Sequence, residues 1–379
     1  MRNLKCILLG LIGITFLISC KKEFSPDLPL PTELSPSLFV VNNNNVVLAI
    51  DPKTGRKKWE YKVDNNVIAT PVVVAGKLVV VDVSGKLYSI NRINGKLETS
   101  VTLGAAVSGT PLVVDDSRLA ISVGNDVKMY NPLDGFNMVW QYGAGVPVTT
   151  SLAKNTIGTS DTLQIFFVGG SSVIALRASD GIVTWRQDVA GAGIFNSSIC
   201  AANHNYLYAG NDDGKIYAFN SRNGSSFWTY QTGSAVQSSP VSVGGNIMAG
   251  SNDRNFYSID SATGLLRWKV TTGDRILSSP FVYDQNVYFG CNDFNLYTVN
   301  IIDGTLKWKS LAFGTLVTSP LVHDKVAYIN SHDNNVYAFD SETGAQKWIY
   351  NTNGYMVSSM ILDNLTEVIV PSISGNNSF

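Results

Sequence analysis

The chain has little charge and little cysteine for its length. Of its 379 residues only 15% are charged, the formal net charge is −1, and no basic stripe is present. Proteins that bind nucleic acid use such a stripe to neutralise phosphates, so the composition argues against a nucleic-acid partner. Cysteine occurs four times, with no CxxC motif and no adjacent pair. We therefore expect Cys200 and Cys291 to be buried free thiols on strands.

Motifs for catalysis and for metal binding are also missing. The sequence contains no HExxH, GxSxG, Walker-type or dinucleotide-binding motif. The three histidines, His204, His323 and His332, lack the spacing of metal ligands and are predicted to be solvated turn residues. Four aspartates recur at one position, as in a calcium site, but a tight hairpin needs the same residue type, which favours turns. These aspartates are Asp213, Asp253, Asp293 and Asp333.

The one sizeable apolar run lies at the N-terminus. Residues 7–18 are too few to span a membrane as a stable helix and have the form of a secretory signal. The run leads into Leu17-Ile18-Ser19-Cys20, which resembles a bacterial lipobox; the alternative is an ordinary signal with an incidental cysteine. The resemblance implies that residues 1–19 are a lipoprotein signal peptide and that Cys20 is lipidated. Residues 20–37, rich in proline, are predicted to be a semi-rigid tether, and Lys21 favours the outer membrane.

One short phrase, in contrast, is present eight times. It consists of an Asx residue, a glycine four residues later and a tryptophan four residues after that. The glycines are Gly55, Gly95, Gly135, Gly181, Gly224, Gly264, Gly304 and Gly344. The tryptophans, which are all that the chain has, are Trp59, Trp140, Trp185, Trp228, Trp268, Trp308 and Trp348. In the second copy Thr99 replaces the tryptophan, in the third Trp140 is displaced by one residue, and in the fourth Arg177 replaces the Asx residue. Self-similarity at a period of about 40 residues indicates a repeat architecture.

Each part of the phrase has a physical role. The short Asx side chain opens a turn by bonding the backbone two residues ahead. The glycine supplies the positive φ that closes this turn. A large flat side chain at one position in each repeat suits a wedge between neighbouring repeats, and its indole N–H needs a partner there. The tryptophans are therefore predicted to be structural.

Within one repeat, the alternation of apolar and polar residues predicts four short antiparallel strands. In the repeat around residues 278–311 these are 278–283, 287–290, 296–299 and 306–309. The first strand carries a phrase of small residues, such as Ser278-Ser279-Pro280, in all eight copies, and we expect its hydroxyls to stay hydrated around a crowded axis. An insertion at 152–164 is expected to be a protruding loop, with drift and partner binding equally open as explanations.

Four strands in each of eight repeats predict an all-β, eight-bladed β-propeller over residues 38–379. The chain begins and ends in the middle of a repeat, so strands from both termini are expected to share one blade and remove the open edges. Residues 368–370 also read as a strand and compete with residues 38–41 for the second place in that blade. One-plus-three and two-plus-two closure therefore both remain open.

The Gly-x-x-x-Trp turn with a Ser-Ser-Pro inner strand resembles the pyrroloquinoline-quinone-type, or quinoprotein-like, propeller repeat. Some members of this superfamily are quinone-dependent dehydrogenases, for which the resemblance implies a vicinal Cys-Cys pair, a calcium site and a catalytic aspartate. No position here matches those motifs, so we predict no cofactor, no metal and no enzymatic activity. Other members are non-catalytic lipoproteins of the outer-membrane β-barrel assembly machinery, and the lipobox, tether and eight blades are similar to their plan.

The loops between the fourth strand of one repeat and the first of the next vary most, and variable loops on a fixed scaffold often hold binding residues. The predicted partner-binding residues are Phe195, Gln237, Asp274, Arg275, Phe313 and Tyr355. Plugging of the channel mouth is an equally open role for the aromatic ones. The predicted function is a monomeric, non-catalytic lipoprotein scaffold of the outer membrane, facing the periplasm or the cell surface, that binds envelope proteins. The alternatives are a propeller that binds a small ligand or glycan and a quinone-dependent dehydrogenase.

Overall fold

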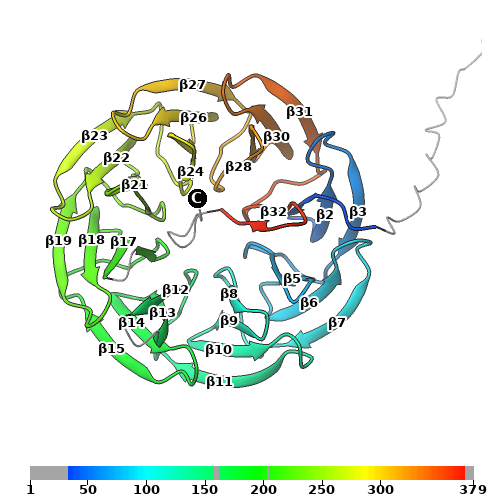
Figure 1. Ribbon diagram of the computed structural model, residues 1–379, viewed down its shortest axis with the longest axis horizontal. Helices are drawn as coiled ribbons and strands as arrows, with labels where there is room; N and C mark the ends of the chain where they lie inside the picture. Colours follow the sequence, from blue (N-terminus) through cyan, green and yellow to red (C-terminus); the bar gives the residue numbers. More distant parts are fainter. Residues whose placement is uncertain (1–32, 158–161, 203–204, 372–379) are drawn as a thin grey trace, which may run out of the picture. The chain divides into compact units, whose positions relative to one another are not determined.

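The computed structural model describes residues 33–157, 162–202 and 205–371, in which every regular element is a β-strand. Residues 31–379 form one compact unit. In this unit eight antiparallel sheets surround a common axis, with one strand of each sheet near the axis and one at the rim (Figure 1). The predicted all-β, eight-bladed propeller is confirmed.

We number the blades from the one that holds the N-terminal strands, and give the strands of each blade from axis to rim. Blade 1 has β32 (Ile361–Asp363), β1 (Ser37–Val41), β2 (Val46–Ile50) and β3 (Lys57–Lys62), with β33 (Val368–Ile369) added inside β32. Blade 2 has β4 (Val72–Val74), β5 (Lys77–Val81), β6 (Lys86–Asn91) and β7 (Leu97–Thr102). Blade 3 has β8 (Leu112–Asp115), β9 (Arg118–Val123), β10 (Asp126–Asn131) and β11 (Asn137–Gly143). Blade 4 has β12 (Ala153–Ile157), β13 (Thr162–Gly169), β14 (Ser172–Arg177) and β15 (Val183–Asp188).

The other four blades are more regular. Blade 5 has β16 (Cys200–Ala202), β17 (Tyr206–Gly210), β18 (Lys215–Asn220) and β19 (Ser226–Gln231). Blade 6 has β20 (Val241–Val243), β21 (Asn246–Gly250), β22 (Asn255–Asp260) and β23 (Leu266–Thr271). Blade 7 has β24 (Phe281–Tyr283), β25 (Asn286–Gly290), β26 (Asn295–Asn300) and β27 (Leu306–Leu311). Blade 8 has β28 (Leu321–His323), β29 (Val326–Asn330), β30 (Asn335–Asp340) and β31 (Gln346–Asn351).

The ring closes in the one-plus-three arrangement. The C-terminal strand β32 pairs with β1 through Phe39 and Ile361, and β2 and β3 complete the blade. Strand β33 does not compete with β1, because it pairs with the other edge of β32, with Ile369 opposite Leu362. Blade 1 therefore has five strands, and its fifth strand lies toward the channel (Figure 1).

The Asx–Gly phrase forms the turn between the third and fourth strands. In blade 6, Asp260 Oδ1 accepts hydrogen bonds from the backbone N–H groups of Ala262 and Thr263. The N–H of Gly264 donates to the Asp260 carbonyl at 2.9 Å, and Gly264 has a φ of +73°, which an L side chain rarely adopts. Beside the turn, the pairing of β22 with β23 shifts register, with Ser258 opposite Trp268 and Ile259 opposite Leu266.

Each tryptophan lies flat against the glycine of the next blade's turn. A Cβ built on Gly304 would stand 2.7 Å from the Trp268 ring, so only glycine fits there. The Trp268 indole N–H donates to the backbone carbonyl of Ile301, in the same turn. The other pairs are Trp348 with Gly55, Trp59 with Gly95, Trp140 with Gly181, Trp185 with Gly224, Trp228 with Gly264 and Trp308 with Gly344. The phrase is thus a contact between blades as well as a turn.

One blade interface lacks this contact and is filled from the other side. Where the second repeat has Thr99 instead of tryptophan, nothing lies within 4 Å of a Cβ built on Gly135. The neighbouring residue Phe136 is buried between blades 2 and 3, packed among residues such as Leu87 and Leu119. It has a φ of +63°, a conformation that costs a bulky residue energy and that its packing must offset. Phe136 therefore replaces the missing indole.

A belt of hydroxyl groups links the inner ends of the blades. The backbone N–H of Thr70 donates to Thr110 Oγ1, and the N–H of Ser239 donates to the hydroxyl of Ser279. The other links run from Thr110 to Ser151, Ser151 to Ser198, Ser198 to Ser239 and Ser319 to Ser359. We predicted only that these hydroxyls stay hydrated. The hydrogen bonds that they accept from the preceding blade were not predicted. In blades 4 and 5 the linking residues are Ser151 and Ser198, and Leu152 and Ile199 follow them where five of the other copies have proline.

The insertion at 152–164 is not the protruding loop that we predicted. Residues 153–157 form β12, which pairs with β13 from Ala153 opposite Phe166 to Ile157 opposite Thr162. The inner hairpin of blade 4 is therefore longer than its counterparts. The tip at 158–161 lies outside the described residues.

Candidate functional site

The turns and loops of the ring gather on two opposite faces. On one face, which we call the loop face, the turn between the second and third strands meets the loop that leads into the same blade's first strand. The N–H of Asn292 donates to the Arg275 carbonyl at 3.1 Å, and the N–H of Asn43 donates to the Tyr355 carbonyl at 2.9 Å. On the other, the turn face, first-to-second and third-to-fourth turns meet, as where the N–H of Ile301 donates to the Gln285 carbonyl.

The recurring aspartates of the loop face are bonded within their own hairpins. Asp253 and Asp293 each accept a hydrogen bond at 2.6 Å from a tyrosine hydroxyl four residues later and another from a glycine N–H of the preceding loop. Burial alone would raise the pKa of Asp293, but the Tyr297 hydroxyl and neighbouring donors hold it below its usual value. No group of three or more His, Cys, Asp or Glu that could hold a metal occurs among the described residues.

Of the predicted partner-binding residues, Asp274 and Arg275 are exposed on the loop face. Asp274 Oδ1 accepts the backbone N–H of Arg275 at 2.7 Å. Gln237 is half-buried and bridges two hairpins, because its amide donates to Asp212 at 3.1 Å and accepts from Asn252 at 3.4 Å. Gln237 therefore ties blade 5 to blade 6, while the Arg275 guanidinium is left at the surface.

Phe195 is wrong as a surface anchor. It is only 1% exposed, and its ring packs against Tyr217 at 5.4 Å and Phe219 at 6.4 Å. The position is apolar and buried in all eight copies, because it closes the core where the chain enters the inner strand. The other seven residues in this position are Val67, Val107, Val148, Val236, Ile276, Leu316 and Met356. A longer loop before Phe195 concealed this alignment.

Phe313 and Tyr355 belong to a row of exposed aromatic side chains in the loops of blades 7 and 8. Phe313 is 72% exposed and stands where the two preceding loops have Gly233 and Gly273. Phe294, in the hairpin beside it, is 43% exposed, and its carbonyl accepts the N–H of Ala312 at 2.8 Å. The packing of the repeat requires neither side chain.

Phe294 was missed from the sequence, although its hairpin carried a signal. Its φ is +72°, in a position where blade 5 has Gly214 and blade 8 has Asn334. Phenylalanine is a costly choice in that conformation, and such strain concentrates at functional sites. Aligning the hairpins by this position would have revealed the exposed aromatic side chain.

His332 joins Tyr355 to this series. Its ring packs edge-on against Tyr355 with 5.4 Å between centroids, and its Nδ1 is 2.9 Å from Thr315 Oγ1. Burial lowers the pKa of His332, which keeps the imidazole neutral near pH 7. We call Phe294, Phe313, His332 and Tyr355 the aromatic cluster. It was predicted in part, since His332 was expected to be a solvated turn residue.

His323 lies on the turn face, away from the aromatic cluster. It is the last residue of β28, not a turn residue, and its Nε2 is 3.2 Å from the Asn364 amide. His204 lies outside the described residues.

The chain enters the ring on the turn face. Strand β1 begins at Ser37, opposite Asp363 at the end of β32. Lys58 donates hydrogen bonds to the Ser35 carbonyl, the Pro36 carbonyl and the Ser37 hydroxyl. These bonds fix the last residues of the predicted tether at the end of the ring that lies away from the aromatic cluster. Cys20 lies outside the described residues.

The residues do not fit the quinone and calcium site that the repeat resemblance implies. Cys200 and Cys291 are buried two blades apart, and neither is in a disulfide. Cys291 follows β25 rather than lying on a strand, and its thiol donates to the Asp274 carbonyl at 3.3 Å. Burial raises the pKa of this thiol to about 11, so it stays protonated at neutral pH.

Comparison with known proteins places the chain in a family. A family model for the outer membrane protein assembly factor BamB matches residues 26–92, 43–198, 169–312 and 296–376. The chain belongs to this family of pyrroloquinoline-quinone-type propellers. A curated relative, the outer membrane protein assembly factor BamB of Nitrosomonas eutropha, is 25% identical over 165 residues, which are 42% of this chain and 39% of the relative. The match thus spans about two fifths of that relative's length.

Solved structures share the fold with little sequence identity. BamB from Moraxella catarrhalis superposes with a TM-score of 0.65 and 14% identity, over 81% of this chain and 96% of that one. A quinohemoprotein alcohol dehydrogenase from Pseudomonas putida gives a TM-score of 0.63 and 14% identity, over 85% of this chain and 72% of that one. Both BamB and a dehydrogenase are therefore built on this propeller. Within the described residues, we find no helix with the length and apolarity that a membrane crossing requires.

Proposed function

We propose that this protein is a non-catalytic scaffold of the outer membrane that binds envelope proteins through its loop face and contributes to outer-membrane protein assembly. The observation that carries the proposal is the aromatic cluster. Aromatic side chains are enriched at protein interfaces and often serve there as anchors. Phe313 is 72% exposed and Tyr355 41%, and neither is needed to pack a blade.

The surroundings of the cluster also resemble an interface. Arg275 and Asp274 lie on the same face, one blade boundary away, and supply charge beside the apolar anchors. Interfaces typically combine such a desolvated centre with a polar rim. Membership of a family named for BamB supports an assembly role.

A lipid on Cys20 would anchor the ring through the tether. Several acyl chains on one residue hold a protein to a membrane, whereas one chain holds it only marginally. Because the chain enters the ring at Ser37 on the turn face, a tethered ring can leave its loop face free for partners. Metabolic labelling with palmitate tests this step: the wild type should be labelled and sediment with outer membranes, and Cys20→Ser should do neither.

The absence of an enzymatic role is part of the proposal. Cys200 and Cys291 are too far apart in the ring to act as a vicinal pair, and the recurring aspartates are bonded to tyrosines. A quinone-dependent oxidation of an alcohol, measured with a dye after addition of quinone and calcium, should remain at background. Turnover above background would contradict the non-catalytic assignment.

The binding proposal is tested by affinity purification of the tagged full-length chain from solubilised membranes. We expect envelope proteins to be recovered, and we expect Phe313→Ser combined with Tyr355→Ser to lose them without a change in melting temperature. Recovery of no envelope protein above background would contradict the proposal. Equal recovery by the double variant would move the interface away from the aromatic cluster.

A further inference from the structure

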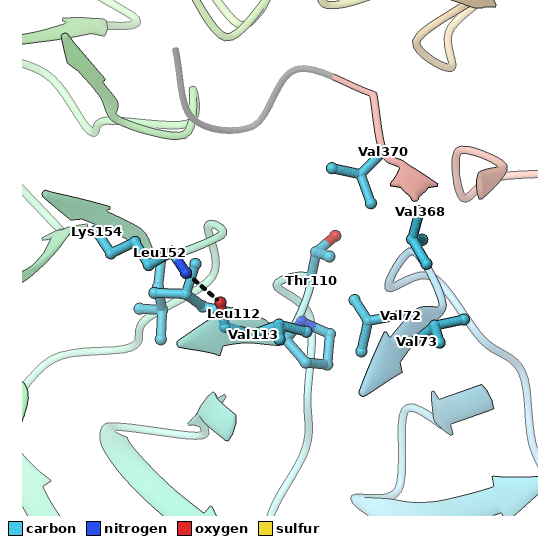
Figure 2. Close-up of a pocket in the computed structure, with 10 residues that line it drawn as sticks. Val72, Val73, Thr110, Leu112, Val113, Leu152, Lys154, Val368 and Val370 are labelled. Atoms are coloured by element: carbon cyan, nitrogen blue, oxygen red, sulfur yellow. Dashed lines mark hydrogen bonds between the residues drawn. The ribbon is translucent and has the colours of Figure 1, made fainter. Parts of the chain in front are cut away.

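A cavity of about 290 Å³, which we call the channel cavity, lies between the inner strands of blades 2 to 4 and the C-terminal segment that forms the fifth strand of blade 1. Its walls are mostly aliphatic and come from four blades: Val72 and Val73 of β4, Leu112 of β8, Leu152 before β12, and Val368 and Val370 of the C-terminal segment. The hydroxyl of Thr110, which already accepts the N–H of Thr70, also lines it. Figure 2 shows the two C-terminal valines facing the β4 valines, with Leu152 and Lys154 on the opposite side. The cavity is small for a binding site, and no aromatic ring lines it.

Lys154 is the one charged residue that lines the cavity. Its ammonium donates to the carbonyl of Val113 at 2.9 Å, as Figure 2 shows, and to that of Val114 at 2.7 Å. An ammonium has three donors, so one remains for another acceptor. Among the described residues no carboxylate lies at ion-pair distance from it, although Asp115, which is bound to Arg118, is near enough to oppose the effect of burial. Burial lowers the pKa of Lys154, which indicates that its charge is poorly solvated.

This combination defines the chemistry of a ligand. A half-buried cation is stabilised by an anion that keeps a hydrogen bond to it, and aliphatic walls are stabilised by an aliphatic body. A sugar would leave its hydroxyls unpaired against valine and leucine, and a folded protein is too large for the space. We propose that the channel cavity binds an aliphatic monocarboxylate, such as a free fatty acid of medium length, with its carboxylate on Lys154 and its chain under β33.

The site is separate from the aromatic cluster. A negative result for this ligand would therefore not contradict the proposed protein scaffold, and the reverse also holds. Lys154 is the second residue of β12, the position that Val73 holds in β4 and Val113 in β8, so a lysine stands where the two preceding inner strands have valine. The valines of the other wall belong to β33 and the residue after it, an addition that the other blades lack. A lysine that departs from the repeat and a strand that is added to it thus meet at one site.

The test is titration of the full-length chain with decanoate and, separately, with methyl decanoate, followed by calorimetry. The ester keeps the chain but lacks the charge, so it distinguishes a free acid from an esterified lipid. We expect the wild type to bind decanoate more tightly than the ester. Lys154→Met should weaken decanoate binding roughly ten- to hundredfold, as expected for a charge-assisted hydrogen bond, and leave the ester unchanged.

Lys128→Met is the matched control. Lys128 is also half-buried and donates to a backbone carbonyl, that of Leu103 at 3.0 Å, but it does not line the cavity. Its loss should leave decanoate binding unchanged. A second variant, Val370→Trp, fills the cavity from a residue that is 40% exposed, and it should abolish binding of both ligands while the protein stays folded.

Absence of decanoate binding by the wild type would overturn the proposal. So would equal binding of decanoate and its ester, or equal weakening by Lys154→Met and Lys128→Met. Binding that survives Val370→Trp would place the ligand elsewhere and likewise reject the site.

Discussion

The two faces of the ring use the same repeat in opposite ways. On the turn face the Asx–Gly phrase is kept, and its glycines receive the tryptophans of neighbouring blades. On the loop face, Phe313 replaces a glycine and Phe294 takes a strained hairpin position, and both rings point into solvent. Residues that repeat therefore stabilise the ring, and the exposed residues of the loop face that break the repeat are available for binding. The predictions below test this division.

The largest effect is expected where a repeated ring is buried between blades. Trp59 is 2% exposed, and Trp59→Ala should lower the free energy of unfolding by about 3–5 kcal/mol, because it leaves a cavity and an unpaired carbonyl. Phe136→Ala should cost about as much, since Phe136 fills the interface that lacks a tryptophan. Denaturant unfolding measures both. A neutral Phe136→Ala would contradict the assigned replacement.

Two glycines of the same phrase provide a sharper comparison. Gly304 and Gly135 both have positive φ, but only Gly304 faces a tryptophan. Gly135→Ala should cost about 1 kcal/mol from backbone strain alone. Gly304→Ala should cost clearly more, because its Cβ would lie 2.7 Å from the Trp268 ring. Equal losses in thermal unfolding would show that the indole contact contributes nothing.

The regular spacing of the repeated residues decided how much of the fold could be predicted from the sequence. Eight glycines at intervals of 40 to 46 residues and seven tryptophans were enough to predict the number of blades and the shared blade. The pairing of β33 could not be predicted, because both edges of β32 accept a strand and the sequence does not say which edge a strand takes. Phe136 escaped notice because it stands one residue after a glycine that looked regular.

The candidate site was harder to predict than the fold. Candidate loop residues were chosen by their difference from neighbouring copies. This choice selected an exposed side chain at Phe313 but a buried one at Phe195, where unequal loop length shifted the alignment. The hydroxyl belt was missed because its bonds join residues about 40 positions apart, such as Thr70 and Thr110. Local reasoning cannot show such contacts.

A smaller effect is expected from acid. The pKa of Asp293 is held below its unfolded value, so its contribution to stability is present above about pH 4 and is lost as the pH falls through the folded pKa. Melting temperature should therefore drop below about pH 4, and less steeply in Asp293→Asn. An identical pH profile for the variant would show that the Tyr297 bond does not carry this dependence.

The smallest effect on stability is expected at Arg275. Its side chain is exposed on the loop face, so Arg275→Ala should change the free energy of unfolding by less than about 0.5 kcal/mol. If Arg275 serves a partner, binding should weaken while the melting curve stays unchanged. Unaltered recovery of every partner would remove Arg275 from the interface and leave the propeller intact.

The division between the faces is tested most directly by one matched pair. Phe313 on the loop face and Ile302 on the turn face are exposed to the same extent, 72% and 71%. Phe313→Ser and Ile302→Ser remove a similar apolar surface from opposite faces and should both leave stability unchanged. Quantitative recovery of envelope proteins by the tagged full-length chain should fall for Phe313→Ser and stay at the wild-type level for Ile302→Ser. Equal recovery by the two variants, or a loss confined to Ile302→Ser, would contradict the account.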